Sequence, residues 1–294
     1  MKKLKYKKID AFASSSSSGN PAGAIYLKSF NDLNTDEMQQ IAKEQKGFVS
    51  EVGFIWEESD GSFGLRYYSS EREVEFCGHA TIAIMYDLIK NRADLLAKNE
   101  IIINTKSDTL IVENHISQND SVFITAPSAK YKSYTSSRKD ILRALRTNER
   151  YLDENFDIDI INAGLETLIV PMKDLDAILS IDPDLSELDE FCKKIGVDII
   201  ILFTNDRFDK KNSYRTRVFA ATFGYLEDPA TGSGNSALGY YLLKYALWSG
   251  SAISIEQNGY KKNYNTVKLM TKEGKVLFGG RAVVKIEGTY LFNK

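Results

Sequence analysis

Residues 75–81 read EFCGHAT, and residues 227–235 read EDPATGSGN. Each segment follows strand-like runs and places small residues and hydroxyl groups where an apolar helix begins. The first turn of a helix has backbone N–H groups without intrahelical partners, so both segments are suited to holding an anion. For one segment alone, glycines that merely allow tight helix packing are the better explanation. Finding the same arrangement twice favours anion binding.

The composition is that of an ordinary globular protein, with 43% hydrophobic and 27% charged residues among 294. This length exceeds one comfortable core and predicts two domains. Strands that feed a glycine-containing turn and an apolar helix occur once in each half, which is a weak internal repeat. We place the boundary at the Ala126-Pro127-Ser128 turn, giving domains at residues 1–126 and 127–294, and consider that the last strand, about 276–294, crosses back to the first domain.

Charge and hydropathy exclude several partners and compartments. Lys and Arg number 38 against 40 Asp and Glu, a net charge of -2, so nucleic acid is not expected to bind. The longest apolar runs, such as residues 198–203, are far shorter than the roughly 20 residues of a membrane span. The basic start, residues 1–8, has no apolar signal region after it, so we expect a cytoplasmic protein. Two cysteines and two histidines predict neither a structural metal site nor a disulfide.

Three titratable residues stand in unusual surroundings. Glu51 interrupts an apolar run, residues 48–56, where burial would raise the pKa of its carboxyl group towards the range useful for acid–base catalysis. His79 lies inside the first glycine turn, and Asp228 precedes Pro229 at the second. Each also has an ordinary explanation: a solvent-facing strand residue, a hydrogen-bonded structural histidine and an Asp-Pro turn. The glycine spacing after residue 232 fits neither a dinucleotide fingerprint nor a P-loop.

Taken together, these segments resemble the signatures of the phenazine-biosynthesis PhzF-like family. The two specific motifs are CGHAT and EDPATGS in that order, and the resemblance covers nearly the whole chain. The matching segments are GNPA at 19–22, SE at 50–51, RYY at 66–68, EVEFCGHAT at 73–81, NAG at 162–164, EDPATGS at 227–233 and GGRAV at 279–283.

The resemblance implies an α+β fold of the diaminopimelate-epimerase type. Two similar domains related by a pseudo-twofold axis would each wrap a curved mixed sheet around a central helix, with the active site between them. It also implies a cofactor-independent isomerase or epimerase, without metal, flavin or nicotinamide, that moves a proton on a small anionic carboxylate-bearing metabolite. A homodimer is expected because the family is often dimeric.

Residue roles follow from the same resemblance and from the two anion-ready turns. Glu51 would shuttle the proton, and His79 and Asp228 would assist catalysis. The residues expected to bind the substrate are Gly78 through its backbone N–H, Ser233, Gly232, Thr231 and Asn20.

Related epimerases of this fold use two cysteines, one at each helix start. Cys77 stands at the first position, but the second falls at Thr231, whose hydroxyl is too weak an acid or base, and Cys192 lies in a separate helical segment. We therefore interpret Cys77 as a small packing residue. A cysteine-dependent epimerase and a non-catalytic binding protein remain the alternatives. Loops at 14–18, 45–49 and 257–260 depart from the family pattern, so the sequence leaves the substrate open.

Overall fold

The structure is a computed structural model that describes residues 1–14, 16–133 and 136–293. Ser15, in the predicted serine-rich loop, lies outside the described residues. The chain divides into two compact units: unit 1 comprises residues 1–125 and the segment from residue 279 to the C-terminus, and unit 2 comprises residues 126–278. Across these described residues, no helix combines the length and the apolar character needed to cross a membrane.

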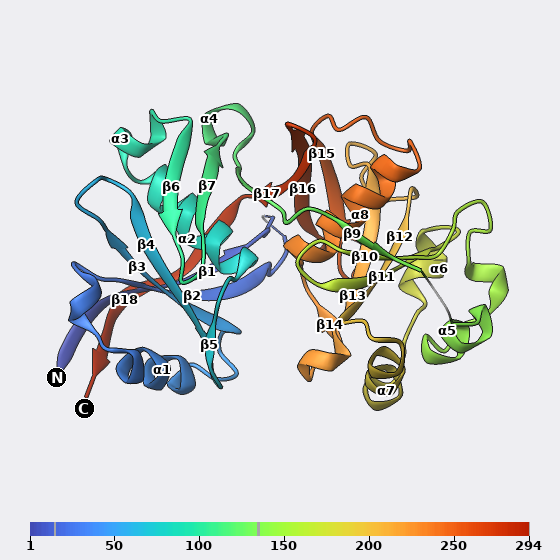
Figure 1. The fold of residues 1–294 in the computed structure, drawn as a ribbon, viewed down its shortest axis with the longest axis horizontal. Coiled ribbons are helices and arrows are strands. Elements are labelled where there is room, and N and C mark those ends of the chain that lie inside the picture. The colour runs from blue at the N-terminus through green and yellow to red at the C-terminus, as the bar shows by residue number, and fades with distance from the viewer. Residues whose placement is uncertain (15, 134–135, 294) are drawn as a thin grey trace. The chain divides into compact units, whose positions relative to one another are not determined.

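Unit 1 is built on one mixed sheet (Figure 1). Neighbouring strands pair antiparallel except β2 with β3 and β4 with β6, which are parallel. A two-residue strand, β5 (Glu73–Val74), pairs with β4. The strand order is β18 (Ala282–Phe292), β1 (Lys2–Ala11), β2 (Asn20–Tyr26), β3 (Glu51–Glu57), β4 (Phe63–Ser69), β6 (Glu100–Asn104), β7 (Thr109–Asn114) and β8 (Val122–Thr125).

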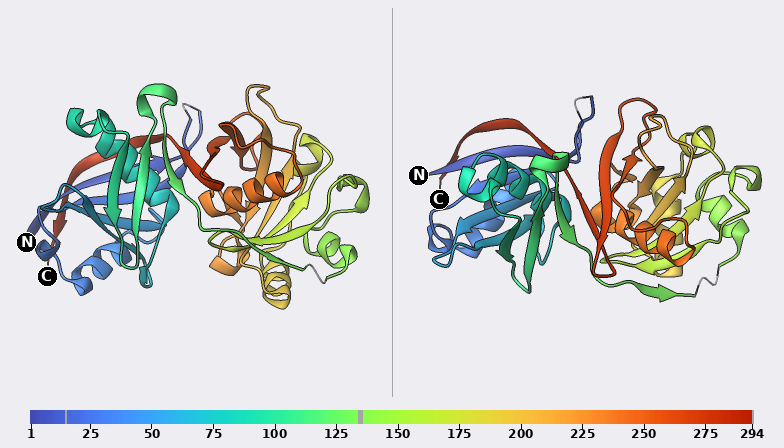
Figure 2. Two further views of the ribbon diagram at one scale, coloured as in Figure 1. Left: turned by 45° about the horizontal axis from the view of Figure 1, so that its top comes forward. Right: turned by 90° about the horizontal axis from the view of Figure 1, so that it is seen from above.

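The sheet of unit 1 curves around helix α2 (Gly78–Lys90), as Figure 2 shows. Helix α2 is apolar on most of its surface and contacts β1, β2, β3, β8 and β18, so nine of its residues are buried. Helix α1 (Thr35–Glu44) packs on β3 and β4 through Met38 and Ile41. Its start is defined by a capping box between Asn34 and Glu37. Short helices η1 (Phe30–Asp32), α3 (Ala93–Leu96) and α4 (Ile116–Asn119) complete the unit.

Unit 2 has a second mixed sheet, in which β11 with β12 and β13 with β15 are the parallel pairs. Two-residue strand β14 (Glu227–Asp228) pairs with β13. The strands are β9 (Lys130–Lys132), β10 (Asp159–Asn162), β11 (Glu166–Pro171), β12 (Ile199–Thr204), β13 (Tyr214–Phe219), β15 (Ile253–Gln257) and β16 (Asn265–Lys272), followed by β17 (Lys275–Gly280) after a tight turn at Glu273 and Gly274.

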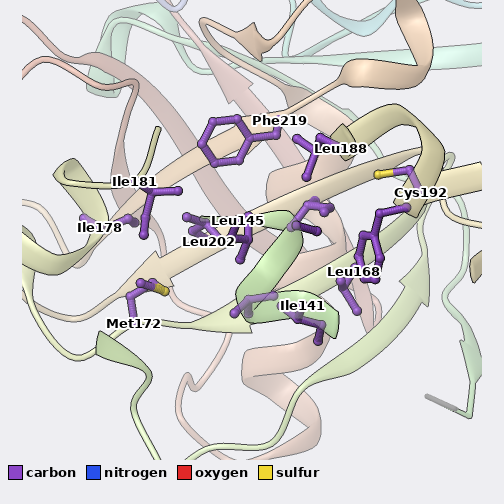
Figure 3. Close-up of a cluster of buried hydrophobic side chains, with 14 of the residues drawn as sticks. Ile141, Leu145, Leu168, Met172, Ile178, Ile181, Leu188, Cys192, Leu202 and Phe219 are labelled. Atoms are coloured by element: carbon purple, nitrogen blue, oxygen red, sulfur yellow. The ribbon is translucent and has the colours of Figure 1, made fainter. Parts of the chain in front are cut away.

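Helices cover both faces of this sheet. Helix α8 (Gly232–Lys244) contacts β10, β11, β12 and β16. Helices α5 (Arg138–Ala144), α6 (Leu175–Leu179) and α7 (Leu185–Ile195) contribute to a hydrophobic cluster with Leu168 and Leu202 (Figure 3). Because successive strand residues point to opposite faces, the near-continuous apolar runs of β11 and β12 serve both sides. Helices η2 (Glu149–Tyr151) and η3 (Ala221–Phe223) are single turns.

The internal repeat is present in the connectivity of the two units. From β1 in unit 1 and from β10 in unit 2, successive strand pairs run antiparallel, parallel, antiparallel, parallel and antiparallel. In each unit helices separate the second and third strands, and a two-residue strand precedes a 13-residue helix. The predicted α+β architecture, two similar units each with a mixed sheet and a central helix, is confirmed.

Candidate active site

The two central helices begin in the same way. Val74 of β5 pairs with Tyr67 and Asp228 of β14 pairs with Val218, and in both units three residues separate the short strand from the helix. Cys77 and Thr231 are therefore the N-cap residues of α2 and α8, and each cap has the extended conformation. The next positions carry Gly78 and His79 in unit 1, and Gly232 and Ser233 in unit 2. The two helix starts thus have the same backbone arrangement but carry different side chains.

Glu51 is the first residue of β3 and lies between Ala22 of β2 and Ser69 of β4. Its side chain is 22% exposed, and its Oε2 lies 3.4 Å from His79 Nε2. Burial raises the pKa of Glu51 to about 7, and a hydrogen bond from Cys77 acts in the opposite direction. A carboxyl group with this pKa exchanges a proton readily near neutral pH, as a general acid–base group must.

In the described part of unit 2, the corresponding strand begins without a carboxylate. The strand at the same place in the connectivity is β12, which begins at Ile199 and is buried along its whole length. Among the described residues, the first position of this strand is thus a carboxylate in unit 1 and an isoleucine in unit 2.

Cys77 has a different environment from the one predicted. It is buried, as a packing residue would be, but its Sγ lies 3.4 Å from His79 Nδ1 and it is hydrogen-bonded to Glu51. The expected burial is confirmed, and the structure adds contacts of the thiol with His79 and Glu51 that the packing interpretation did not include. The helix-start position two residues before a histidine was the signal in the sequence.

Asp228 and Thr231 are brought together at the start of α8. The Thr231 hydroxyl donates a hydrogen bond to Asp228 Oδ2, and both side chains are buried. Ser233, the second residue of α8, is half-buried. Gly232 is needed for packing, because a Cβ atom there would lie 2.4 Å from the Phe278 ring.

Gln257, the last residue of β15, holds this turn in place and was missed from the sequence. Its Oε1 accepts from the Thr231 backbone N–H at 3.0 Å and from Asn235 Nδ2 at 2.6 Å. Its Nε2 donates to the Asp228 carbonyl at 2.9 Å and to Thr231 Oγ1 at 3.1 Å. The alternation of Ile253, Ile255 and Gln257 on one face of a strand was the available signal.

Asn20, the remaining predicted substrate-binding residue, is the buried first residue of β2. It lies two residues before Ala22, which is the parallel neighbour of Glu51. The structure thus brings Glu51, Cys77 and His79 together in unit 1, with Asn20 on the adjoining strand. In unit 2 it brings together Asp228, Thr231 and Gln257.

The second cysteine belongs to another environment. Cys192 lies in α7 within the hydrophobic cluster of unit 2 (Figure 3), and burial raises the pKa of its thiol to about 12. A neutral, inert thiol follows from such a pKa. The N-cap of α8, where a second reactive thiol would be required, is Thr231.

Comparison with known proteins identifies the family. The family model described as phenazine biosynthesis-like protein, PhzC-PhzF, matches residues 9–288. The chain belongs to this family. An uncharacterized isomerase of Bacillus subtilis, YfhB, is 30% identical over 100% of this chain and 98% of the relative. An uncharacterized isomerase of Clostridium acetobutylicum is 31% identical over 84% of this chain and 82% of its own length. These two relatives are thus named as isomerases.

Solved structures show the same fold. The Bacillus anthracis phenazine biosynthesis protein of the PhzF family has a TM-score of 0.86 at 24% identity, covering 99% of this chain and 100% of that one. A hydroxyproline epimerase from Agrobacterium vitis, solved with bound trans-4-hydroxy-L-proline, has a TM-score of 0.57 at 12% identity, covering 98% and 92%. These likenesses confirm the predicted fold, shared by PhzF-family proteins and by an epimerase.

Proposed function

We propose that this PhzF-family protein is an isomerase that moves a proton on a small carboxylate-bearing metabolite, with Glu51 as its acid–base group and no metal or organic cofactor. The observation that carries the proposal is the position of Glu51: a largely buried carboxyl group, with its pKa raised to about 7, 3.4 Å from His79. Membership in the family and the isomerase names of its relatives support the reaction class.

In the proposed step, ionised Glu51 takes a proton from a carbon next to a carbonyl or carboxyl group of the substrate. The electrons of the C–H bond enter the conjugated system and charge develops on the oxygen. The protonated Glu51 then returns the proton to another carbon of that system, which completes the shift without oxidant or reductant. His79 and the Gly78 N–H at the start of α2 would stabilise the developing negative charge, as hydrogen-bond donors do in an oxyanion hole.

We assign substrate binding in unit 2 to Asp228, Thr231, Gly232 and Ser233. The backbone N–H groups in the first turn of α8 suit a carboxylate. The buried hydrogen bond from the Thr231 hydroxyl to Asp228 fixes the orientation of the aspartate at the start of α8, where its carboxylate would face a substrate donor. In unit 1, we also assign substrate binding to Asn20, which lies on the strand beside that of Glu51.

One proton carrier favours a shift over an inversion. A carrier that lifts a proton and returns it on one side suits an allylic or keto–enol rearrangement, whereas inversion by two thiols needs a second acid. Thr231 occupies the N-cap that would hold the second thiol. A cysteine-dependent epimerase is therefore the less favoured candidate, although an epimerase shares this fold.

Proton exchange in heavy water tests the proposal. The full chain is incubated in D₂O with a panel of cyclic and amino carboxylic acids, and deuterium uptake is followed by mass spectrometry. We expect exchange into at least one substrate class and its loss, by about 100-fold or more, in Glu51→Gln. Glu57→Gln is the matched control, because Glu57 ends the same strand, is exposed and pairs with Arg92 on the surface. Full exchange in Glu51→Gln would refute the assignment of the base.

A further inference from the structure

Three donor atoms of different chemistry meet beside the proposed base. Glu51, Cys77 and His79 each offer one ligand atom, and these atoms all lie within 4.8 Å of one another. A carboxylate oxygen, a thiolate sulfur and an imidazole nitrogen are the three donor types that bind zinc in proteins. The proposed proton transfer uses the carboxylate and the imidazole but does not use the thiol.

The spacing suits one small cation. In a tetrahedral zinc site with bonds of about 2.0–2.3 Å, neighbouring ligand atoms lie roughly 3.3–3.8 Å apart. Cys77 Sγ and His79 Nδ1 are already 3.4 Å apart, and the three ligand atoms lie within 4.8 Å of one another, so the side chains would have to close in on a bound ion. The backbone that carries these side chains is held in place on both sides. Glu51 lies on β3, which pairs with β2 and β4, and Cys77 and His79 lie at the start of the buried helix α2.

The local charges also allow a cation. Within the described part of the chain, Glu51 Oε2 is buried without a hydrogen-bond partner, and no lysine or arginine forms an ion pair with Glu51. The positive end of the α2 dipole opposes a cation, but it also stabilises the thiolate that would bind one. Two anionic ligands and one neutral ligand would then balance a divalent ion.

We propose that Glu51, Cys77 and His79 form a reversible binding site for a thiophilic divalent cation of the zinc type, and that occupancy blocks proton transfer. On binding, the Cys77 thiol releases its proton to solvent and three metal–ligand bonds form, leaving a fourth position for water. The bound ion holds the Glu51 oxygen that would accept the substrate proton. The proposal of cation binding depends only on these three side chains, while the proposal of inhibition rests on the proposed function.

Cobalt substitution tests the binding. Titrating Co²⁺ into the reduced full-length protein should give one equivalent of a species with thiolate-to-cobalt charge-transfer absorption, displaced by Zn²⁺. Cys77→Ser should lose that absorption, and both Cys77→Ser and His79→Asn should weaken Zn²⁺ binding about tenfold or more. Cys192→Ala is the matched cysteine control and should keep the wild-type spectrum, because Cys192 lies in the core of unit 2. Circular dichroism checks that each variant is folded.

Inhibition is measured on the wild-type protein. Stoichiometric Zn²⁺ should abolish deuterium exchange, and a chelator should restore it. Absence of the charge-transfer absorption in the wild type, or its persistence in Cys77→Ser, would overturn the site. Full exchange by the zinc-loaded protein would overturn the inhibitory role. Cobalt binding by a protein that exchanges no proton would sustain the site and count against the proposed function instead.

Discussion

His79 Nε2 lies 3.4 Å from Glu51 Oε2, a contact between the second residue of a helix and the first residue of a strand. The contact is possible because α2 packs against β3, and Glu51 is the residue at which the parallel pairing of β2 with β3 begins. A carboxyl group so placed loses most of its hydration, and its pKa rises. The predictions below test this pair and the turn that corresponds to it in unit 2.

The rate of exchange should depend on pH through Glu51. Since the ionised carboxylate is the base and its pKa is about 7, kcat/KM should rise with pH and level off above about pH 7. Deuterium uptake measured between about pH 5 and pH 9 gives the profile. A rate independent of pH over this range would contradict the assignment.

Stability should fall as Glu51 ionises. Its pKa is raised in the folded state from 4.5 to about 7, so the fold favours the protonated form. This contribution is fully present below pH 4.5 and is lost as the pH rises through 7. Glu51→Gln should therefore increase the free energy of unfolding above pH 7, by up to on the order of 3 kcal/mol, with no gain near pH 4. Urea unfolding of both proteins at several pH values measures the difference, and equal curves would refute it.

Replacing the Cys77 side chain should move the acid limb of the rate profile. Burial dominates the raised pKa of Glu51, and the hydrogen bond from Cys77 partly offsets it. Cys77→Ala removes that hydrogen bond and should shift the limb to higher pH, whereas Cys77→Ser retains a donor and should keep it near the wild-type position. A thiol mechanism predicts instead that both variants lose activity altogether.

Gln257→Leu should loosen the turn that carries Asp228. The substitution leaves the Thr231 N–H, the Asn235 amide and the Asp228 carbonyl without their buried partner. We expect a loss of at least about 2 kcal/mol in the free energy of unfolding and, where the variant folds, a raised KM. Gln40→Leu, on the exposed side of α1, is the control and should change stability little. An unchanged KM would show that the turn does not position substrate.

Gly232→Ala should destabilise the protein because the added methyl group would clash with the Phe278 ring. The new Cβ would lie 2.4 Å from the Phe278 side chain, which cannot rotate away as a flexible chain can. A cost of about 1–3 kcal/mol is expected, and Phe278→Leu in the same protein should recover part of it. Gly288→Ala, where a Cβ would meet nothing within 4 Å, provides the comparison. Additive effects of the two substitutions at 232 and 278 would refute the clash.

Local sequence patterns were sufficient for much of this protein. Small residues before an apolar run predicted both helix starts, the alternation of strands and helices predicted two similar units, and the apolar neighbours of Glu51 indicated the direction of its pKa shift. The cytoplasmic location, the homodimer and the residue roles stay predictions.

Only the tertiary structure decided which side chains meet. The pairing of Lys2 with Phe292 assigns the last strand to unit 1. The contact of Cys77 with His79 and Glu51, and the hydrogen bonds of Gln257 to the α8 turn, join residues from different elements. Local propensity specifies where a helix or strand begins, because it depends on neighbours within a few residues. Strand register and the approach of a strand to a helix depend on burial shared by the whole sheet, which no single segment encodes.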